Sequence, residues 1–165
     1  MGRLDPNQSV TLSLLERLID NDPQNSKTEA TMSRAQSVRQ LKAGLKRDLE
    51  WLLNTRRRPD EAKDSYPELR NSMYNYGLPD LTHYSISSAR DMNRLAWLLE
   101  GCIGAFEPRL NGIKVLMEPL TDGSRMLRFT IEGMLRMDPA PERVSFDTVL
   151  ELTSGTYQVK GDSGA

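Results

Sequence analysis

The chain has 165 residues, and its 22 Lys and Arg side chains are balanced by 23 Asp and Glu side chains, which gives a net charge of -1. A protein that binds nucleic acid needs a surplus of cations on one face, so this balance argues against nucleic acid as a partner. Because there is one cysteine (Cys102), one histidine (His83) and no glycine-rich phosphate loop, we expect no intrachain disulfide, no metal and no cofactor. No apolar run approaches the roughly 18 residues of a membrane span, and the N-terminus lacks a signal-peptide core, so we expect a cytosolic protein without direct membrane insertion.

The first 31 residues combine a short leucine-rich stretch with a polar linker. Over residues 9–19, apolar side chains surround the pair Glu16-Arg17, which predicts a helix that is too short to be stable alone in water. Residues 20–31 are polar and contain Asn-Asp-Pro, which is typical of a mobile linker. Two interpretations remain open, because such a helix can dock on a partner or fold back onto its own domain.

Residues 32–160 are expected to form one α+β domain. Apolar residues recur with the helical period over 33–54 and 88–106, and Ser88 with Asp91 resembles a capping pair at the start of the second helix. After Arg109 the period changes to two, with Gly133 as a candidate bulge, and strands are expected at 113–117, 127–135, 144–152 and 156–160. The predicted fold is therefore helices packed on one face of a small antiparallel sheet of about four strands, with a disordered tail at 161–165.

The connection between the two long helices contains an unusual turn sequence, Asn75-Tyr76-Gly77-Leu78-Pro79-Asp80. Gly77 can adopt a positive φ, and Pro79 keeps the residue before it extended. Several tyrosines lie in and around this segment, which favours packing against the domain. We therefore favour a pinned connection between two helices over a ligand-binding loop.

Glu107-Pro108-Arg109 marks the boundary between the helical and the strand-rich halves. Pro108 has no amide donor and pushes the residue before it out of the α region, so the helix is expected to stop there. A carboxylate and a guanidinium then flank a rigid kink. They either form a local ion pair at the helix end or present one to a partner, and sequence alone leaves both open.

Two classes of function fit these features. A lysozyme-like glycoside hydrolase would need Glu107 as a protonated acid beside a second carboxylate from Asp91, Glu100, Asp122 or Glu132. The neighbouring Arg109 favours the ionised carboxylate, which is the opposite of what a general acid requires. An assembly protein would instead use a bare sheet edge, and the strand at 156–160 with Tyr157 and Val159 is the natural place for it.

The chain resembles the TssE family of type VI secretion baseplate subunits, which belongs to the contractile-phage baseplate wedge proteins sometimes labelled lysozyme-like. The resemblance rests on four blocks in chain order: Leu14-Leu15-Glu16-Arg17-Leu18, residues 48–56, residues 74–80 and Phe106-Glu107-Pro108-Arg109-Leu110. Leu15 stands where the family usually has Phe. Together the blocks span nearly the whole chain.

The resemblance implies a non-catalytic wedge component that sits with TssF, TssG and TssK at the inner face of the bacterial inner membrane. It also implies a platform on which the sheath of TssB and TssC begins to polymerise, and a fold like the inner domain of sheath subunits. By the same resemblance, Glu107, Pro108 and Arg109 hold the inner baseplate and the sheath start together. The leucine-rich block and the strand with Tyr157 and Val159 are the further expected partner contacts.

Overall fold

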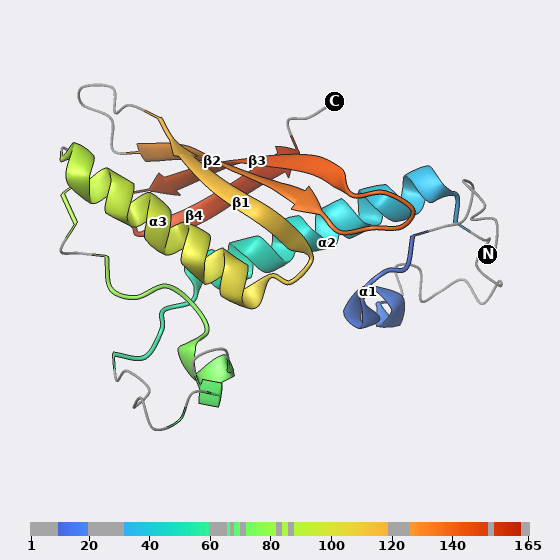
Figure 1. The fold of residues 1–165 in the computed structure, drawn as a ribbon, viewed down its shortest axis with the longest axis horizontal. Coiled ribbons are helices and arrows are strands. Elements are labelled where there is room, and N and C mark those ends of the chain that lie inside the picture. The colour runs from blue at the N-terminus through green and yellow to red at the C-terminus, as the bar shows by residue number, and fades with distance from the viewer. Residues whose placement is uncertain are drawn as a thin grey trace.

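The computed structural model describes residues 10–19, 32–59, 66, 68–69, 72–81, 84–85, 88–118, 126–151 and 154–162. Helices are followed by a four-stranded antiparallel sheet of order β1-β2-β3-β4, which confirms the predicted α+β fold (Figure 1). The elements are α1 (Leu14–Leu18), α2 (Arg34–Asn54), a 3-10 turn η2 (Met73–Asn75), α3 (Ala89–Phe106), β1 (Leu110–Met117), β2 (Met126–Leu135), β3 (Glu142–Glu151) and β4 (Thr156–Asp162).

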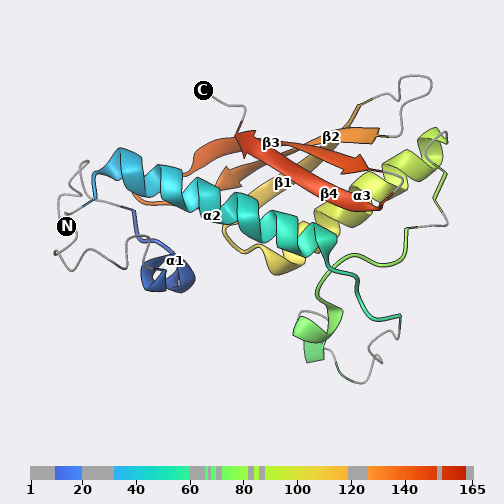
Figure 2. The ribbon, with the colours of Figure 1, turned by 180° about the vertical axis from the view of Figure 1, so that it is seen from behind.

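Both long helices cover the same face of the sheet. α3 packs against β1 and α2 against β4, while the other face is left uncovered by helices in the two opposite views (Figures 1 and 2). The strands supply the matching apolar face because β2 and β3 alternate between buried and exposed side chains. The core between the layers contains fully buried side chains from every layer, among them Leu45, Leu49, Leu99, Ile103, Phe129, Ile131 and Phe146.

Each helix begins at a serine whose hydroxyl accepts a backbone N–H of the first turn. Ser33 does this for α2 and Ser88 for α3, as the sequence predicted for Ser88. The carboxylate of Asp91 accepts the N–H of Ser85 at 3.2 Å, so it fixes the approach to α3. α1 is shorter than the apolar stretch suggested because Ser13 is its N-cap, in a capping box with Glu16.

The predicted bulge at Gly133 is wrong, and the irregularity lies in the neighbouring strand. Gly133 pairs in register with Val144 of β3, whereas the β1–β2 register shifts between Asn111 and Lys114. Gly112, within that shift, has φ of +61°, which an L side chain adopts only with strain. β4 also runs to Asp162, so residues 161 and 162 belong to the sheet rather than to a disordered tail. The predicted linker at 20–31 and residues 163–165 lie outside the described residues.

The loop after α2 is held by main-chain hydrogen bonds to the end of that helix. Leu78 N–H donates to the carbonyl of Thr55, and Arg57 N–H donates to the carbonyl of Leu78, both at 2.8 Å. Gly77 has φ of +104°, and a Cβ at this position would lie 2.3 Å from the Thr55 carbonyl oxygen. The ring of Tyr76 stands edge-on to Phe106 of α3, with 5.3 Å between the ring centroids. The loop therefore ties the end of α2 to the end of α3.

Candidate functional site

The site begins at the corner between α3 and β1, where Glu107 and Arg109 meet. Glu107 is the C-cap of α3, and its N–H donates the last helical hydrogen bond to the carbonyl of Ile103. The exposed Pro108 then leads the chain into β1. The Arg109 guanidinium donates two hydrogen bonds to the Glu107 carboxylate, from Nε to Oε1 at 2.7 Å and from Nη2 to Oε2 at 2.5 Å. Glu107 is only 5% exposed, so this is a buried, two-point ion pair.

Asp48, from the middle of α2, joins the pair to the helix layer. Arg109 Nη2 donates to Asp48 Oδ2 at 2.6 Å, and Arg47 donates from Nε and Nη2 to Asp48 Oδ1 at 3.0 and 2.9 Å. The hydrogen bonds to Glu107 raise the pKa of Arg109 above its ordinary value, although burial acts in the opposite direction, and Asp48 adds to the rise. The guanidinium is thus a permanently charged junction between α2 and the corner.

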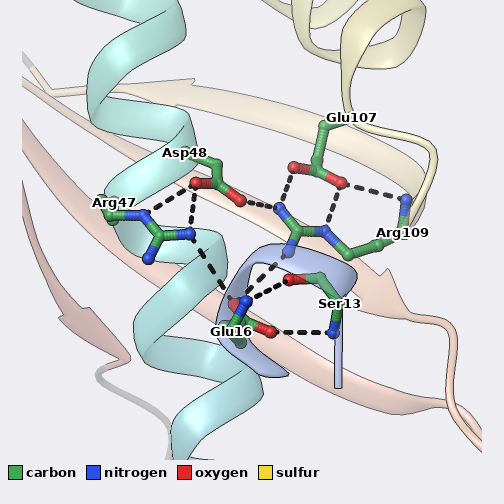
Figure 3. A network of polar contacts seen from close by, with 6 residues as sticks. All are labelled: Ser13, Glu16, Arg47, Asp48, Glu107 and Arg109. Atoms are coloured by element: carbon green, nitrogen blue, oxygen red, sulfur yellow. Dashed lines mark hydrogen bonds and ion pairs between the residues drawn. The ribbon is translucent and has the colours of Figure 1, made fainter. Parts of the chain in front are cut away.

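Glu16 brings α1 to the same cluster (Figure 3). Its Oε1 lies 3.9 Å from Nη1 of Arg109 and 3.9 Å from Nη2 of Arg47, while its Oε2 accepts the N–H of Ser13 at 3.0 Å. The carboxylate occupies a gap in α2 at Gly44, where a Cβ would lie 1.4 Å from Glu16 Oε1. The helix therefore approaches α2 through an acidic side chain and not through its leucines.

The leucines of α1 point away from the domain. Leu14 is 70% exposed, Leu18 72% and Leu15 45%, whereas Glu16 is 5% exposed. The segment before the helix is anchored separately, because Val10 is buried and its N–H donates to the Ser37 hydroxyl at 2.9 Å. α1 thus folds back onto the domain while its leucines stay exposed; whether they bind a partner stays a prediction.

The expected strand edge is arranged differently from what the sequence suggested. The side chains of Tyr157 and Val159 are buried in the core, because they alternate onto the face that the helices cover. At the outer edge of β4, Asn54 from the end of α2 binds both main-chain groups of one residue: its amide donates to the Tyr157 carbonyl at 2.8 Å, and its oxygen accepts the Tyr157 N–H at 2.9 Å. On the opposite edge, Glu100 of α3 accepts the Val115 N–H at 2.9 Å.

The carboxylates considered for a glycosidase have structural partners. Glu107 is paired with Arg109 and Glu100 with the edge of β1, while Glu132 binds Arg143 at 2.8 Å. Asp122 lies outside the described residues. One groove of about 320 Å³ lies between α3 and the loop that contains Gly77, and its lining includes no Asp or Glu. In the described part of the chain there is no group of three or more His, Cys, Asp or Glu side chains able to hold a metal ion.

Glu16, Glu107 and Arg109 were expected from the sequence as partner contacts in separate blocks, whereas their meeting in one cluster with Gly44 and Asp48 was not expected. Gly44 carried a signal, because glycine in the middle of an amphipathic helix costs stability and suggests a close approach by another group. Asp48 carried none, since an acidic residue on the polar side of a helix is ordinary. Which acidic residue meets Arg109 depends on the tertiary fold.

Comparison with family models assigns this α+β chain to the structural baseplate proteins of contractile machines. Over residues 39–140, more than half of its length, the chain matches baseplate wedge protein gp25, and it belongs to that family. This confirms the family expected from the sequence, which is that of TssE. Searches of curated proteins and of solved structures gave no match. None of the helices in the described ranges is long and apolar enough to cross a membrane.

Proposed function

We propose that this chain is a TssE-type, non-catalytic baseplate subunit of a type VI secretion machine, assembled in the cytoplasm at the inner face of the bacterial inner membrane. Membership of the family supports a structural baseplate role. The proposed contact with neighbouring subunits rests on one observation. A buried ionic cluster holds α1 so that Leu14, Leu15 and Leu18 face outward. Exposed leucines on a fixed helix are a docking surface rather than a core.

The leucine face of α1, with the exposed Arg17 beside it, is the proposed contact with TssF, TssG or TssK. Glu107 and Arg109 support that contact indirectly, because their ion pair fixes the turn between α3 and β1 and Arg109 faces Glu16 of α1. Pro108 is the exposed residue of the motif and is proposed to meet a neighbour directly. Such contacts stabilise an assembly because they bury apolar surface that is exposed to solvent in the free subunit.

The sheath subunits TssB and TssC are proposed to pair with an edge of the sheet. β1 and β4 are the outer strands, and main-chain pairing adds strands without needing particular side chains. At β4, Asn54 already imitates such a partner by binding both main-chain groups of Tyr157, with Val159 next along the same edge. An incoming strand would replace that amide.

A non-catalytic role is supported by the state of Glu107. Both of its oxygens accept hydrogen bonds from Arg109, so the carboxylate is engaged in a structural ion pair. The groove beside α3 offers no carboxylate for a two-carboxylate mechanism.

The proposal is tested in a bacterium that assembles this machine, with a fluorescent sheath subunit as the reporter. Changing Leu14, Leu15 and Leu18 together to Gln is expected to abolish sheath foci while the purified variant keeps its circular dichroism spectrum, because these side chains contribute little to the core. Met73→Gln alters an exposed apolar side chain elsewhere and is expected to leave the foci normal. Normal sheaths in the leucine variant would refute the docking role.

A further inference from the structure

The contact between α1 and the domain depends on one carboxylate. Within α1 the only buried residue is Glu16. The exposed leucines cannot hold the helix in place, and a helix of five residues has little stability of its own. The hold therefore comes from the position of Glu16 over α2, helped by Val10 and Leu12, which pack on the core before the helix.

The place that Glu16 occupies, called here the Gly44 notch, consists of Gly44 with the guanidinium groups of Arg47 and Arg109. Gly44 leaves the space, since a Cβ there would lie 1.4 Å from Glu16 Oε1. The two guanidinium groups supply positive charge from two different elements, each at 3.9 Å from the same oxygen. The notch thus has the space for one carboxylate oxygen and has two guanidinium groups facing it.

Glu16 lies close against α2 in this notch but makes no hydrogen bond to a described residue through Oε1. Within the described residues, neither Glu16 Oε1 nor Arg109 Nη1 has a hydrogen-bond partner, although both atoms are buried. The same two arginines make bonds of 2.5 to 3.0 Å to Asp48 and Glu107. Glu16 is therefore attracted by charge without the short hydrogen bonds that would lock it in place.

The rest of the cluster does not need Glu16 for its charge balance. Asp48 and Glu107 supply two carboxylates against the two guanidinium groups of Arg47 and Arg109, and Glu16 is a third acid. Removing Glu16 leaves a balanced, hydrogen-bonded set. Departure of α1 would therefore uncover the notch without dismantling the cluster.

We propose that the Gly44 notch is a carboxylate-binding site and that Glu16 is its exchangeable resident ligand. An acidic side chain on a short helical segment of another protein takes the notch in place of Glu16. Residues 10–19 are then released together with their leucines. This inference concerns the chain alone and does not depend on the proposed baseplate role.

Amide hydrogen exchange of the full-length chain tests whether Glu16 holds α1 on the domain. Two variants, both in α1, are compared. Glu16→Gln removes the charge, whereas Leu18→Gln removes an exposed leucine and keeps the charge. Exchange of the Val10 and Ser13 amides is expected to rise at least about tenfold in Glu16→Gln and to stay within about twofold in Leu18→Gln. Protection in β2 should be unchanged in both, which shows that the domain is folded. An equal rise in both variants would overturn the proposal.

Gly44→Ala is an independent variant, because it fills the notch without changing any charge. We expect the same release of residues 10–19 as in Glu16→Gln, since the new Cβ would occupy the position of the carboxylate. Unchanged protection of Val10 and Ser13 in this variant would show that Glu16 is not seated there.

Exchangeability is tested by adding a ligand to the full-length Glu16→Gln chain labelled with ¹⁵N. The probe is a synthetic peptide of residues 10–19, either with the native Glu or with Gln at position 16. The Glu peptide is expected to shift the Nε–H signals of Arg47 and Arg109, and the Gln peptide is not. Equal shifts with both peptides, or no shift with either, would refute a carboxylate site.

Discussion

Arg109 is the central residue of the ionic cluster, because it contacts all three of its carboxylates. It pairs with Glu107 beside it in sequence and with Asp48, which lies 61 positions away on α2. Its remaining nitrogen faces Glu16 of α1. One planar side chain with several donors thus joins the corner, a long helix and the N-terminal helix, which a lysine could not do.

Replacing Arg109 is expected to destabilise the domain itself. Arg109→Ala leaves the buried Glu107 without a counter-charge and should lower the free energy of unfolding by about 3–5 kcal/mol. Arg109→Lys keeps the charge but loses the two-point geometry, so a smaller loss is expected. Urea denaturation followed by circular dichroism measures both.

The matched control is Arg143, whose ion pair with Glu132 is largely exposed. Arg143→Ala should cost less than about 1 kcal/mol, because exposed pairs contribute little. If Arg109→Ala costs no more than this control, the cluster does not stabilise the fold.

Stability is expected to fall at alkaline pH because the partly buried Cys102 and the buried Tyr157 resist ionisation. Burial raises the pKa of Cys102 from 9.0 to about 11 and that of Tyr157 from 10.0 to about 12. Above pH 9.0 the unfolded chain loses protons that the folded chain keeps, so the free energy of unfolding declines as pH rises from 9.0 to about 12. Tyr157→Phe should remove the upper part of this decline and spare the part due to Cys102. A urea-derived stability that stays level across this range would contradict the prediction.

At the scale of elements, a side chain from each long helix binds main-chain groups at one edge of the sheet. Asn54 at the end of α2 occupies both main-chain groups of Tyr157, and Glu100 of α3 accepts the N–H of Val115. An edge strand otherwise offers unpaired groups to any other chain. These two contacts satisfy main-chain groups that would otherwise be unpaired at Tyr157 and Val115.

Asn54→Ala is expected to lower the free energy of unfolding by about 1–2 kcal/mol, because two hydrogen bonds to the edge of β4 are lost. Asn54→Asp keeps the acceptor for the Tyr157 N–H and loses the donor to its carbonyl, so an intermediate loss is expected. Asn93, exposed on α3, supplies the control, and Asn93→Ala should change stability by less than about 0.5 kcal/mol. Thermal or urea unfolding measures both changes. If Asn54→Ala lowers the free energy of unfolding no more than Asn93→Ala does, the contact between Asn54 and β4 does not stabilise the fold.

At the scale of the whole molecule, the N-terminal helix lies apart from the layered domain. α2 and α3 cover one face of the sheet, and α1 lies beside α2 (Figures 1 and 2). The leucines of α1 are exposed. A baseplate protein must keep its own fold while it presents surfaces to several neighbours. This arrangement meets that need because α1 is held by charge and leaves its apolar face free.

Local features of the fold could be predicted from the sequence, whereas contacts across the fold could not. The helical and strand periods and the Ser88 cap depend on neighbouring residues, so they were predictable. The bulge was misplaced because Gly112 and Gly133 face each other across β1 and β2, and sequence does not say which strand carries the extra residue. The partnership of Glu16 with Gly44 was not predictable, since it depends on how the N-terminal segment returns to α2.

The most direct test of the account is a structure of this chain inside an assembled baseplate, determined by electron cryo-microscopy. We expect the side chains of Leu14, Leu15 and Leu18 to be covered by a neighbouring subunit. A baseplate in which these leucines remain exposed to solvent, with all neighbours contacting other surfaces, would contradict it.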